Sequence, residues 1–252
     1  MLNKWALVTG ATAGIGEAAA RRLAKEGYSL ILGGRRKDRL EKLQDELKAS
    51  GAQVRLAPVD LQDRKSVEGF CKTHQDWLQE VRVLVNNAGL ARGTEKVQDA
   101  SVDDWDLMID TNVKGLLYLT RQVLPHFVRA KEGHIVNIGS VAGRWVYPGG
   151  AVYCASKHAV RAISEGLRLD LSGTGVRVTN IEPGMVETEF SMVRFQDQQK
   201  AKAVYQGMTP LKADDIADTI AWCLNRPAHV NIQEIVIYPT DQASVGLVHR
   251  QS

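Results

Sequence analysis

Short apolar runs alternate with longer amphipathic stretches along almost the whole chain. The runs are mostly continuous stretches of Val, Ile and Leu, which is typical of strands that are buried on both faces of a sheet. They lie at Trp5–Val8, Leu30–Leu32, Val54–Ala57, Val81–Val85, Ile135–Ile138, Val176–Ile181 and Ile235–Ile237. We predict a strand at each of these positions.

The stretches between the runs have helical spacing. Gly16–Glu26 places its apolar residues on one face, and Gly27 follows where a helix C-cap belongs. Lys37–Ala49 carries three leucines on one face, and Ser101 is a plausible N-cap for a helix that runs towards Thr111. Alternating strands and helices predict an α/β fold, a doubly wound parallel sheet with helices on both faces.

Composition narrows the class of protein. The 252 residues are 44% hydrophobic and 24% charged, so the chain can fill a sizeable core, and we interpret residues 1–252 as a single domain. A net charge of +3 is too small to indicate a nucleic-acid partner. Three scattered cysteines fit a reducing compartment, and no long apolar stretch predicts a membrane span. We therefore expect a cytoplasmic protein with no membrane partner.

The first predicted strand leads into a turn rich in glycine. Glycines here let the backbone approach a pyrophosphate, and the N-terminus of the following helix offers free N–H groups to it. A plain strand-to-helix turn is the alternative, although three glycines in seven residues would be costly for that alone. The predicted dinucleotide-binding residues of this turn are Gly10, Thr12, Ala13, Gly14, Ile15 and Gly16.

The end of the second predicted strand bears on the choice of cofactor. A site for NAD usually has an acidic residue here, which binds the ribose hydroxyls. This chain has Arg35 and Arg36 instead, and guanidinium groups suit a 2′-phosphate. The two residues favour NADP over NAD.

Other predicted strands end in residues that would meet the same ligand crevice. Each group is weak evidence alone, because turns commonly use Asn, Asp and Gly. The candidates for cofactor binding are Asp60, Leu61, Asn87, Ala88, Gly89, Pro183, Gly184, Val186 and Thr188, of which Thr188 would reach the nicotinamide carboxamide.

Three later residues form a candidate catalytic group. Tyr153 and Lys157 are four residues apart on a predicted helix, so they share a face, and Ser140 ends the fifth predicted strand. A nearby ammonium favours the phenolate, and a tyrosine with a lowered pKa can exchange a proton with an alcohol. Asn112, within a helical pattern, either bends the helix and holds a water or is an ordinary exposed residue. No spacing of His or Cys predicts a metal site.

Taken in order, these motifs resemble those of the classical short-chain dehydrogenase/reductase family. The shared pattern is Thr-Gly-x-x-x-Gly-x-Gly, Asn-Asn-Ala-Gly, Asn112, Ser140, Tyr153-x-x-x-Lys157 and Pro183-Gly184. The resemblance implies a Rossmann-like seven-stranded sheet in the order 3-2-1-4-5-6-7. It also implies that Tyr153 is the acid/base and that Lys157 binds the nicotinamide ribose, with both contacting the cofactor. Ser140 would position the substrate oxygen, and Asn112 would hold a water.

A narrower likeness is to the NADP-dependent 3-hydroxy acid dehydrogenases, which oxidise serine and allo-threonine. It rests on Gly34-Arg35-Arg36, Trp105-x-x-Met108-Ile-Asp110-Thr-Asn112, Ile181-Glu182, Thr188-Glu189-Phe190-Ser191 and Pro227-Ala-His229-Val-Asn231. A carboxylate substrate needs a nearby cation, and Arg144 and Arg194 are the candidates, with Trp145 beside the first. An ordinary surface arginine is the alternative for each.

These features together predict an NADP-dependent oxidoreductase that acts on small 3-hydroxy acids. The alternatives are a reductase for an uncharged ketone, steroid or pterin, and a non-catalytic nucleotide sensor or scaffold on the same fold. The resemblance also implies a homo-oligomer, with a tetramer as the expected form.

Overall fold

The computed structural model describes residues 4–251, and its centre is one parallel sheet. The seven strands lie in the order β3-β2-β1-β4-β5-β6-β9 and are parallel throughout. Their bounds are β1 Trp5–Thr9, β2 Ser29–Gly34, β3 Val54–Pro58, β4 Val81–Asn86, β5 Gly133–Ile138, β6 Val176–Pro183 and β9 Glu234–Ile237. Each contains a predicted strand, so the predicted Rossmann-like fold is confirmed.

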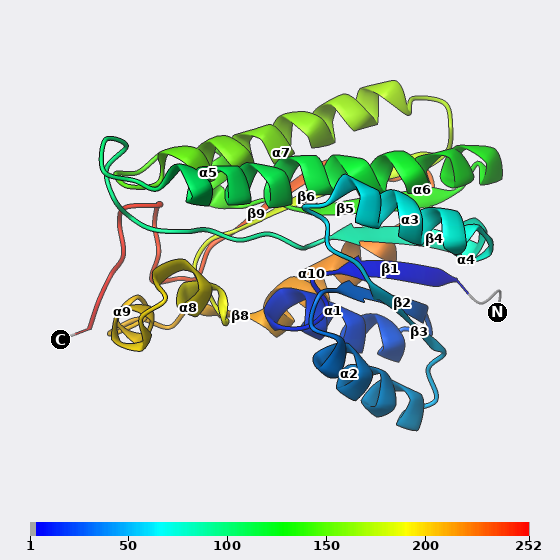
Figure 1. The fold of residues 1–252 in the computed structure, drawn as a ribbon, viewed down its shortest axis with the longest axis horizontal. Helices are drawn as coiled ribbons and strands as arrows, with labels where there is room; N and C mark the ends of the chain where they lie inside the picture. The colour runs from blue at the N-terminus through cyan, green and yellow to red at the C-terminus, as the bar shows by residue number, and fades with distance from the viewer. Residues whose placement is uncertain (1–3, 252) are drawn as a thin grey trace.

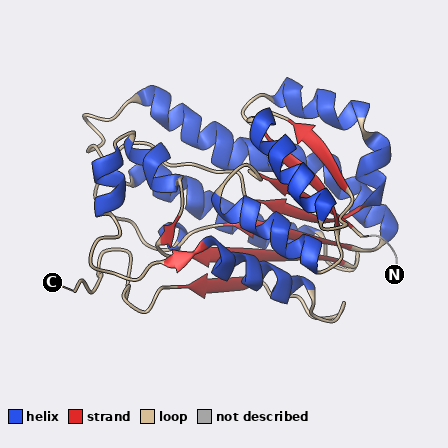
Figure 2. Cartoon of the chain, turned by 90° about the horizontal axis from the view of Figure 1, so that it is seen from below, coloured by secondary structure: helices blue, strands red, loops and turns tan. Residues whose placement is uncertain are grey.

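Helices cover both faces of this sheet (Figures 1 and 2). One side holds α1 (Gly14–Lys25), α2 (Lys37–Ala49) and α10 (Ala213–Leu224). The other holds α3 (Arg64–Thr73), α4 (Gln75–Glu80), α6 (Leu116–Ala130) and α7 (Ala151–Asp170). Within residues 4–251, no helix is both long enough and apolar enough to cross a lipid bilayer.

Two apolar cores result from the alternation of side chains along the strands. On β1, Ala6 and Val8 pack into the core beneath α1, α2 and α10, whereas Leu7 packs into the opposite core. Both cores are buried, which explains why the strands read as continuous apolar runs. The predicted α2 has the expected bounds and buries its three leucines.

Helix α1 ends at the glycine that was predicted to cap it. Gly27 has a φ of +84°, and its N–H donates to the Ala24 carbonyl at 3.0 Å. Tyr28 N–H donates to the Leu23 carbonyl at 3.1 Å, which completes a Schellman motif. Ser101 is less effective than expected: it is the N-cap residue of α5 (Val102–Ile109), but its side chain makes no capping hydrogen bond.

Several short elements gather beyond the carboxyl ends of the strands. They are η1 (Asp110–Gly115), η2 (Val141–Gly143), α8 (Phe190–Phe195), α9 (Gln198–Ala203) and the two-residue strands β7 (Val186–Glu187) and β8 (Leu211–Lys212). Figure 1 shows α8 and α9 at the left, past the strand ends and apart from both helical layers. The carboxyl edge of a parallel sheet is where such folds bind ligands.

Candidate active site

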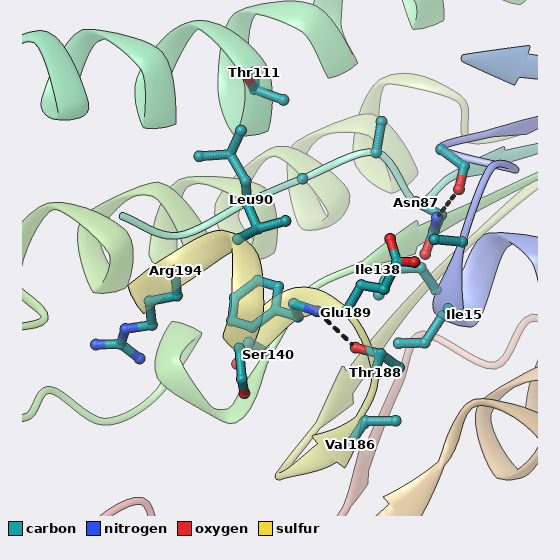
Figure 3. A pocket seen from close by; sticks show the side chains of 18 of the residues that line it. Ile15, Asn87, Leu90, Thr111, Ile138, Ser140, Val186, Thr188, Glu189 and Arg194 are labelled. Atoms are coloured by element: carbon teal, nitrogen blue, oxygen red, sulfur yellow. Dashed lines mark hydrogen bonds between the residues drawn. The ribbon is translucent and has the colours of Figure 1, made fainter. Parts of the chain in front are cut away.

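A pocket of about 650 Å³ opens at this carboxyl edge. Figure 3 shows Ile15 and Asn87 at one end and Arg194 at the other, with Leu90 and Thr111 above and Val186 and Thr188 below. The pocket is therefore long enough to run from the glycine-rich turn after β1 to the short helix α8.

Nearly all of the predicted cofactor residues line this pocket. They are Gly10, Thr12, Ala13, Gly14, Ile15, Arg35, Arg36, Asp60, Leu61, Asn87, Ala88, Gly89, Tyr153, Lys157, Pro183, Gly184, Val186 and Thr188. The exception is Gly16, which lies behind the turn. A Cβ there would be 2.3 Å from the Gly10 carbonyl oxygen, so the turn depends on this glycine for its close packing.

The glycine turn has the shape that a pyrophosphate requires. Gly14 has a φ of +55°, and a Cβ on it would approach the Thr188 side chain to 3.1 Å across the cleft. The N-cap of α1 is Ala13, which offers no side-chain acceptor to the first N–H groups of the helix. Those N–H groups are therefore open to an anion, and the residues present fit a dinucleotide.

A small network joins this turn to the loop after β4. Thr9 Oγ1 accepts hydrogen bonds from the backbone N–H groups of Asn87 and Ala88, both at 3.0 Å. Asn87 Nδ2 donates in return to the Thr9 carbonyl at 3.0 Å. The network holds the two predicted cofactor loops in one arrangement.

Tyr153 and Lys157 lie on the same face of α7 and are both buried. Lys157 Nζ donates to the Ile138 carbonyl at 2.9 Å and lies 6.0 Å from the centre of the Tyr153 ring. Burial lowers the pKa of the Lys157 ammonium to about 8 and raises the pKa of the Tyr153 phenol above its usual range. The structure thus gives the opposite of the expected shift in the tyrosine pKa, because desolvation of the buried phenol outweighs the lowering effects of Ser140 and Arg194.

Ser140 is fixed at the end of β5, where η2 begins. Its hydroxyl oxygen accepts a hydrogen bond from Ala142 N–H at 3.1 Å, and it lines the pocket together with Tyr153. The Ser140 side chain also acts to lower the pKa of Tyr153, although burial has the larger effect. The pocket therefore contains both Ser140 and Tyr153.

Asn112 occupies a π-helical turn, η1, between α5 and α6. Its Oδ1 accepts from Leu90 N–H at 2.8 Å, and its Nδ2 donates to the Leu90 carbonyl at 2.8 Å and to Ser156 Oγ at 3.0 Å. The residue is buried, so the exposed alternative is wrong, and the helix is distorted where a bend was expected. Both amide N–H groups are used within the protein.

Arg194 projects from α8 towards Tyr147 and Tyr153. Its Nη1 donates to Tyr147 Oη at 3.1 Å and its Nε to the Gly93 carbonyl at 3.2 Å. The guanidinium carbon lies 6.0 Å from the centre of the Tyr153 ring. Because a guanidinium has five N–H donors, others remain for an anionic ligand.

Arg144 and Trp145 do not line the pocket. The Arg144 guanidinium pairs with Glu182 and Glu234, on β6 and β9, and the Trp145 side chain is exposed. Glu182 is completely buried, and its carboxylate also accepts from Asn180 Nδ2 at 2.8 Å. The structure therefore places these two predicted substrate residues outside the pocket and gives Arg144 a structural role.

Several lining residues were not among the predicted site residues. They include Leu90, Arg92, Tyr147, Glu189, Phe190, Val193 and Gln242. Glu189 and Phe190 follow Thr188 directly, so their position next to a predicted site residue was the available signal. Tyr147 lies three residues beyond Arg144, in a loop whose path a sequence pattern does not show.

A model of the short chain dehydrogenase family matches residues 4–199. The chain is 51% identical to the NADP-dependent 3-hydroxy acid dehydrogenase YdfG of Salmonella typhi, over 97% of this chain and 98% of that one. It is 48% identical to sulfoacetaldehyde reductase 2 of Chromohalobacter salexigens, over 94% of each chain.

A solved structure is also similar over its whole length. It is the closed form of a serine dehydrogenase complexed with NADP⁺, which is 48% identical and superimposes with a TM-score of 0.90. The match covers 98% of this chain and 100% of that one. The superposition therefore extends well beyond the sheet.

Proposed function

Because this chain belongs to the short-chain dehydrogenase family, we propose that its pocket performs NADP-dependent interconversion of a secondary alcohol and a carbonyl group. The leading substrate class is a small 3-hydroxy acid of the serine or allo-threonine type. The observation that carries the proposal is the meeting of Ser140, Tyr153 and Lys157 in the pocket that also contains the glycine turn.

The cofactor would lie along the pocket, with its pyrophosphate at the N-terminus of α1. We assign the 2′-phosphate to Arg35 and Arg36 and the nicotinamide end to Pro183–Thr188. When bound, NADP⁺ supplies the hydride acceptor. The protein then has to orient the alcohol and move its proton.

Tyr153 is proposed to exchange that proton, because its phenol lies in the same pocket as the Ser140 hydroxyl. Its raised pKa keeps the phenol protonated in the chain alone, which suits donation to a carbonyl oxygen. Lys157 contributes a positive charge to the wall of the pocket and would bind the nicotinamide ribose. Since the side-chain N–H groups of Asn112 are engaged, a relay water would have to meet its remaining Oδ1 lone pair or a nearby backbone carbonyl.

Arg194 supports an acidic substrate. A 3-hydroxy acid has its carboxylate two carbons from the reacting carbon, and the Arg194 guanidinium carbon lies 6.0 Å from the centre of the Tyr153 ring, so one small substrate can contact both residues. The names of two relatives also support an anionic substrate, since one is named for a 3-hydroxy acid and the other for sulfoacetaldehyde. The shared feature of both substrates is a small carbon chain that ends in an anion.

The test is an assay of the purified protein with NADP⁺ and a panel of 3-hydroxy acids and uncharged secondary alcohols. We expect NADPH to form with the acids, and Tyr153→Phe should lower kcat about a hundredfold or more, as for loss of a general acid/base. An absence of NADPH above the Tyr153→Phe control on every substrate would contradict the proposal. Activity on the uncharged alcohols alone would favour the alternative reductase.

We further propose that the protein is a cytoplasmic homo-oligomer, with a tetramer as the expected form. Exposed apolar side chains near η2 and along α7 support an interface between copies, because Trp145 and Val146 are more than half exposed. Leu169, near the end of α7, is exposed to a similar degree.

A further inference from the structure

The proposed 2′-phosphate site already contains a carboxylate of this chain. Glu189, at the N-terminus of α8, lines the pocket and contacts two arginines that follow β2. Its oxygens accept from Arg36 Nη1 at 3.0 Å and from Arg39 Nη1 at 2.7 and 2.9 Å. Two positively charged residues on one rim are thus bridged by one anion from the other rim.

The other side of the Arg36 guanidinium also has a partner. Its Nε and Nη2 donate to Thr12 Oγ1 at 3.2 and 2.9 Å, within the glycine turn. With Nη1 on Glu189, each nitrogen of this guanidinium already has a partner. A phosphate that approaches Arg36 on its Nη1 side therefore meets the Glu189 carboxylate, which it repels and with which it competes for the guanidinium.

We propose that Glu189 is a cofactor-specificity residue, an internal anion that occupies the 2′-phosphate site until NADP displaces it. The inference rests on the proposed role of Arg36 in binding that phosphate. A 2′-phosphate carries more negative charge than a carboxylate, so it competes successfully for Arg36 and Arg39. NAD has no such group, and it leaves the bridge in place.

The position of Glu189 connects this exchange to the substrate end of the pocket. Glu189 directly precedes α8, which carries Phe190 and Arg194 into the pocket wall. While the bridge is intact, the start of α8 is tied to the loop after β2. When a phosphate displaces Glu189 from the arginines, this end of α8 is released. The 2′-phosphate of the cofactor thereby affects the helix that carries Arg194, the residue proposed to bind the substrate carboxylate.

The experiment measures the affinity of three nucleotides for the wild-type protein and for Glu189→Gln. The probes are NADP⁺, NAD⁺ and adenosine 2′,5′-bisphosphate, which has the extra phosphate but no nicotinamide. We expect Glu189→Gln to lower the Kd of both 2′-phosphorylated probes about three- to tenfold, as for loss of competition from a half-exposed ion pair. The Kd of NAD⁺ should not change.

Glu187→Gln is the matched control, because Glu187 has the same charge, is exposed on β7 and does not line the pocket. It should leave all three affinities as they are. Unchanged or weaker binding of the 2′-phosphorylated probes by Glu189→Gln would overturn the inference. So would equal tightening of NADP⁺ and NAD⁺, because the effect would then not involve the phosphate.

Arg36→Gln separates this inference from the proposal on which it rests. If Arg36 binds the 2′-phosphate, Arg36→Gln weakens NADP⁺ and spares NAD⁺, whatever Glu189 does. If Arg36→Gln has no such effect, the assigned phosphate site is wrong. If Arg36→Gln weakens the binding of NADP⁺ but Glu189→Gln does not tighten it, only the proposed role of Glu189 is refuted.

Discussion

Arg194 is positioned by two contacts that leave part of its guanidinium free. Tyr147 and the Gly93 carbonyl hold one edge of the group, and the rings of Tyr147 and Phe195 lie within 5.6 Å of its carbon. Such packing limits the freedom of a long side chain before a ligand binds, so less entropy is lost on binding. Under the proposed function, we expect this single residue to distinguish an acidic substrate from an uncharged one.

Replacement of Arg194 should therefore affect substrates according to their charge. We expect Arg194→Gln to lower kcat/KM for a 3-hydroxy acid by roughly ten- to a hundredfold, which corresponds to about 1.5–3 kcal/mol for a hydrogen bond to a charged group. For the methyl ester of the same acid, kcat/KM should change little, because the ester has no carboxylate charge. The measurement is kcat/KM for both compounds, and an equal loss on acid and ester would show that Arg194 does not bind the carboxylate.

Arg144 acts at the scale of elements, because its ion pairs join η2 to two neighbouring strands. Its partners are Glu182 on β6 and Glu234 on β9, and Arg161 of α7 bonds Glu234 at 2.8 Å. Burial raises the pKa of Glu182, so this carboxylate depends on its partners to remain charged. The network fixes the loop that begins at Ser140.

Loss of Arg144 should destabilise the whole fold. We expect Arg144→Ala to lower the free energy of unfolding by about 3 kcal/mol, near the lower end for a broken buried ion pair because Arg161 remains close to Glu182. The loss should shrink as pH falls, because removal of the Arg144 charge raises the pKa of the buried Glu182 carboxyl further, so protonation favours the folded state of the variant more than that of the wild type. Urea unfolding at several pH values measures both effects.

A second substitution tests whether the buried charge is the cause. Arg144→Ala combined with Glu182→Gln should recover part of the lost stability, since no unpaired carboxylate remains. Arg129→Ala on the exposed end of α6 is a control that should change stability little. If the double variant is no more stable than Arg144→Ala, the charge of Glu182 is not responsible.

The sequence predicted the elements of this fold better than the directions of its long side chains. Strands and most cofactor residues follow from local signals, since apolar runs form strands and glycines mark the turn after β1. Arg144 and Arg194 are indistinguishable by such signals. Glu182 is 38 residues from Arg144, and only the packing of η2 on β6 reveals the pair. For the same reason, the bridge from Glu189 to Arg36 was not predicted.

At the scale of the whole molecule, the pocket collects residues from both halves of the sheet. Arg35 follows β2, whereas Gly184 follows β6, three positions beyond the central strand β1. A cofactor that contacts both would bind only the assembled sheet and would stabilise the folded state as a whole. The interpretation of residues 1–252 as one domain stays a prediction.

NADP⁺ should therefore raise the melting temperature more than NAD⁺ at equal concentration. At a hundred times its Kd, a ligand adds about 2.7 kcal/mol, which is roughly 5–10 °C for a chain of this size. Arg35→Asp should reduce the shift with NADP⁺ and keep or increase the shift with NAD⁺. Differential scanning fluorimetry measures all four combinations, and an unchanged preference in Arg35→Asp would argue against this cofactor assignment.

The π-helical turn at Asn112 also determines which faces α5 and α6 present to their surroundings. Each residue of an α-helix advances by about 100°, so the wider turn of η1 rotates α6 relative to α5. With this offset, Leu107 of α5 lines the pocket while Phe127 of α6 packs into the core against the sheet. Deletion of one residue between Asp110 and Gly115 would bring the two helices back into phase, and one of these faces would then turn away from its partner.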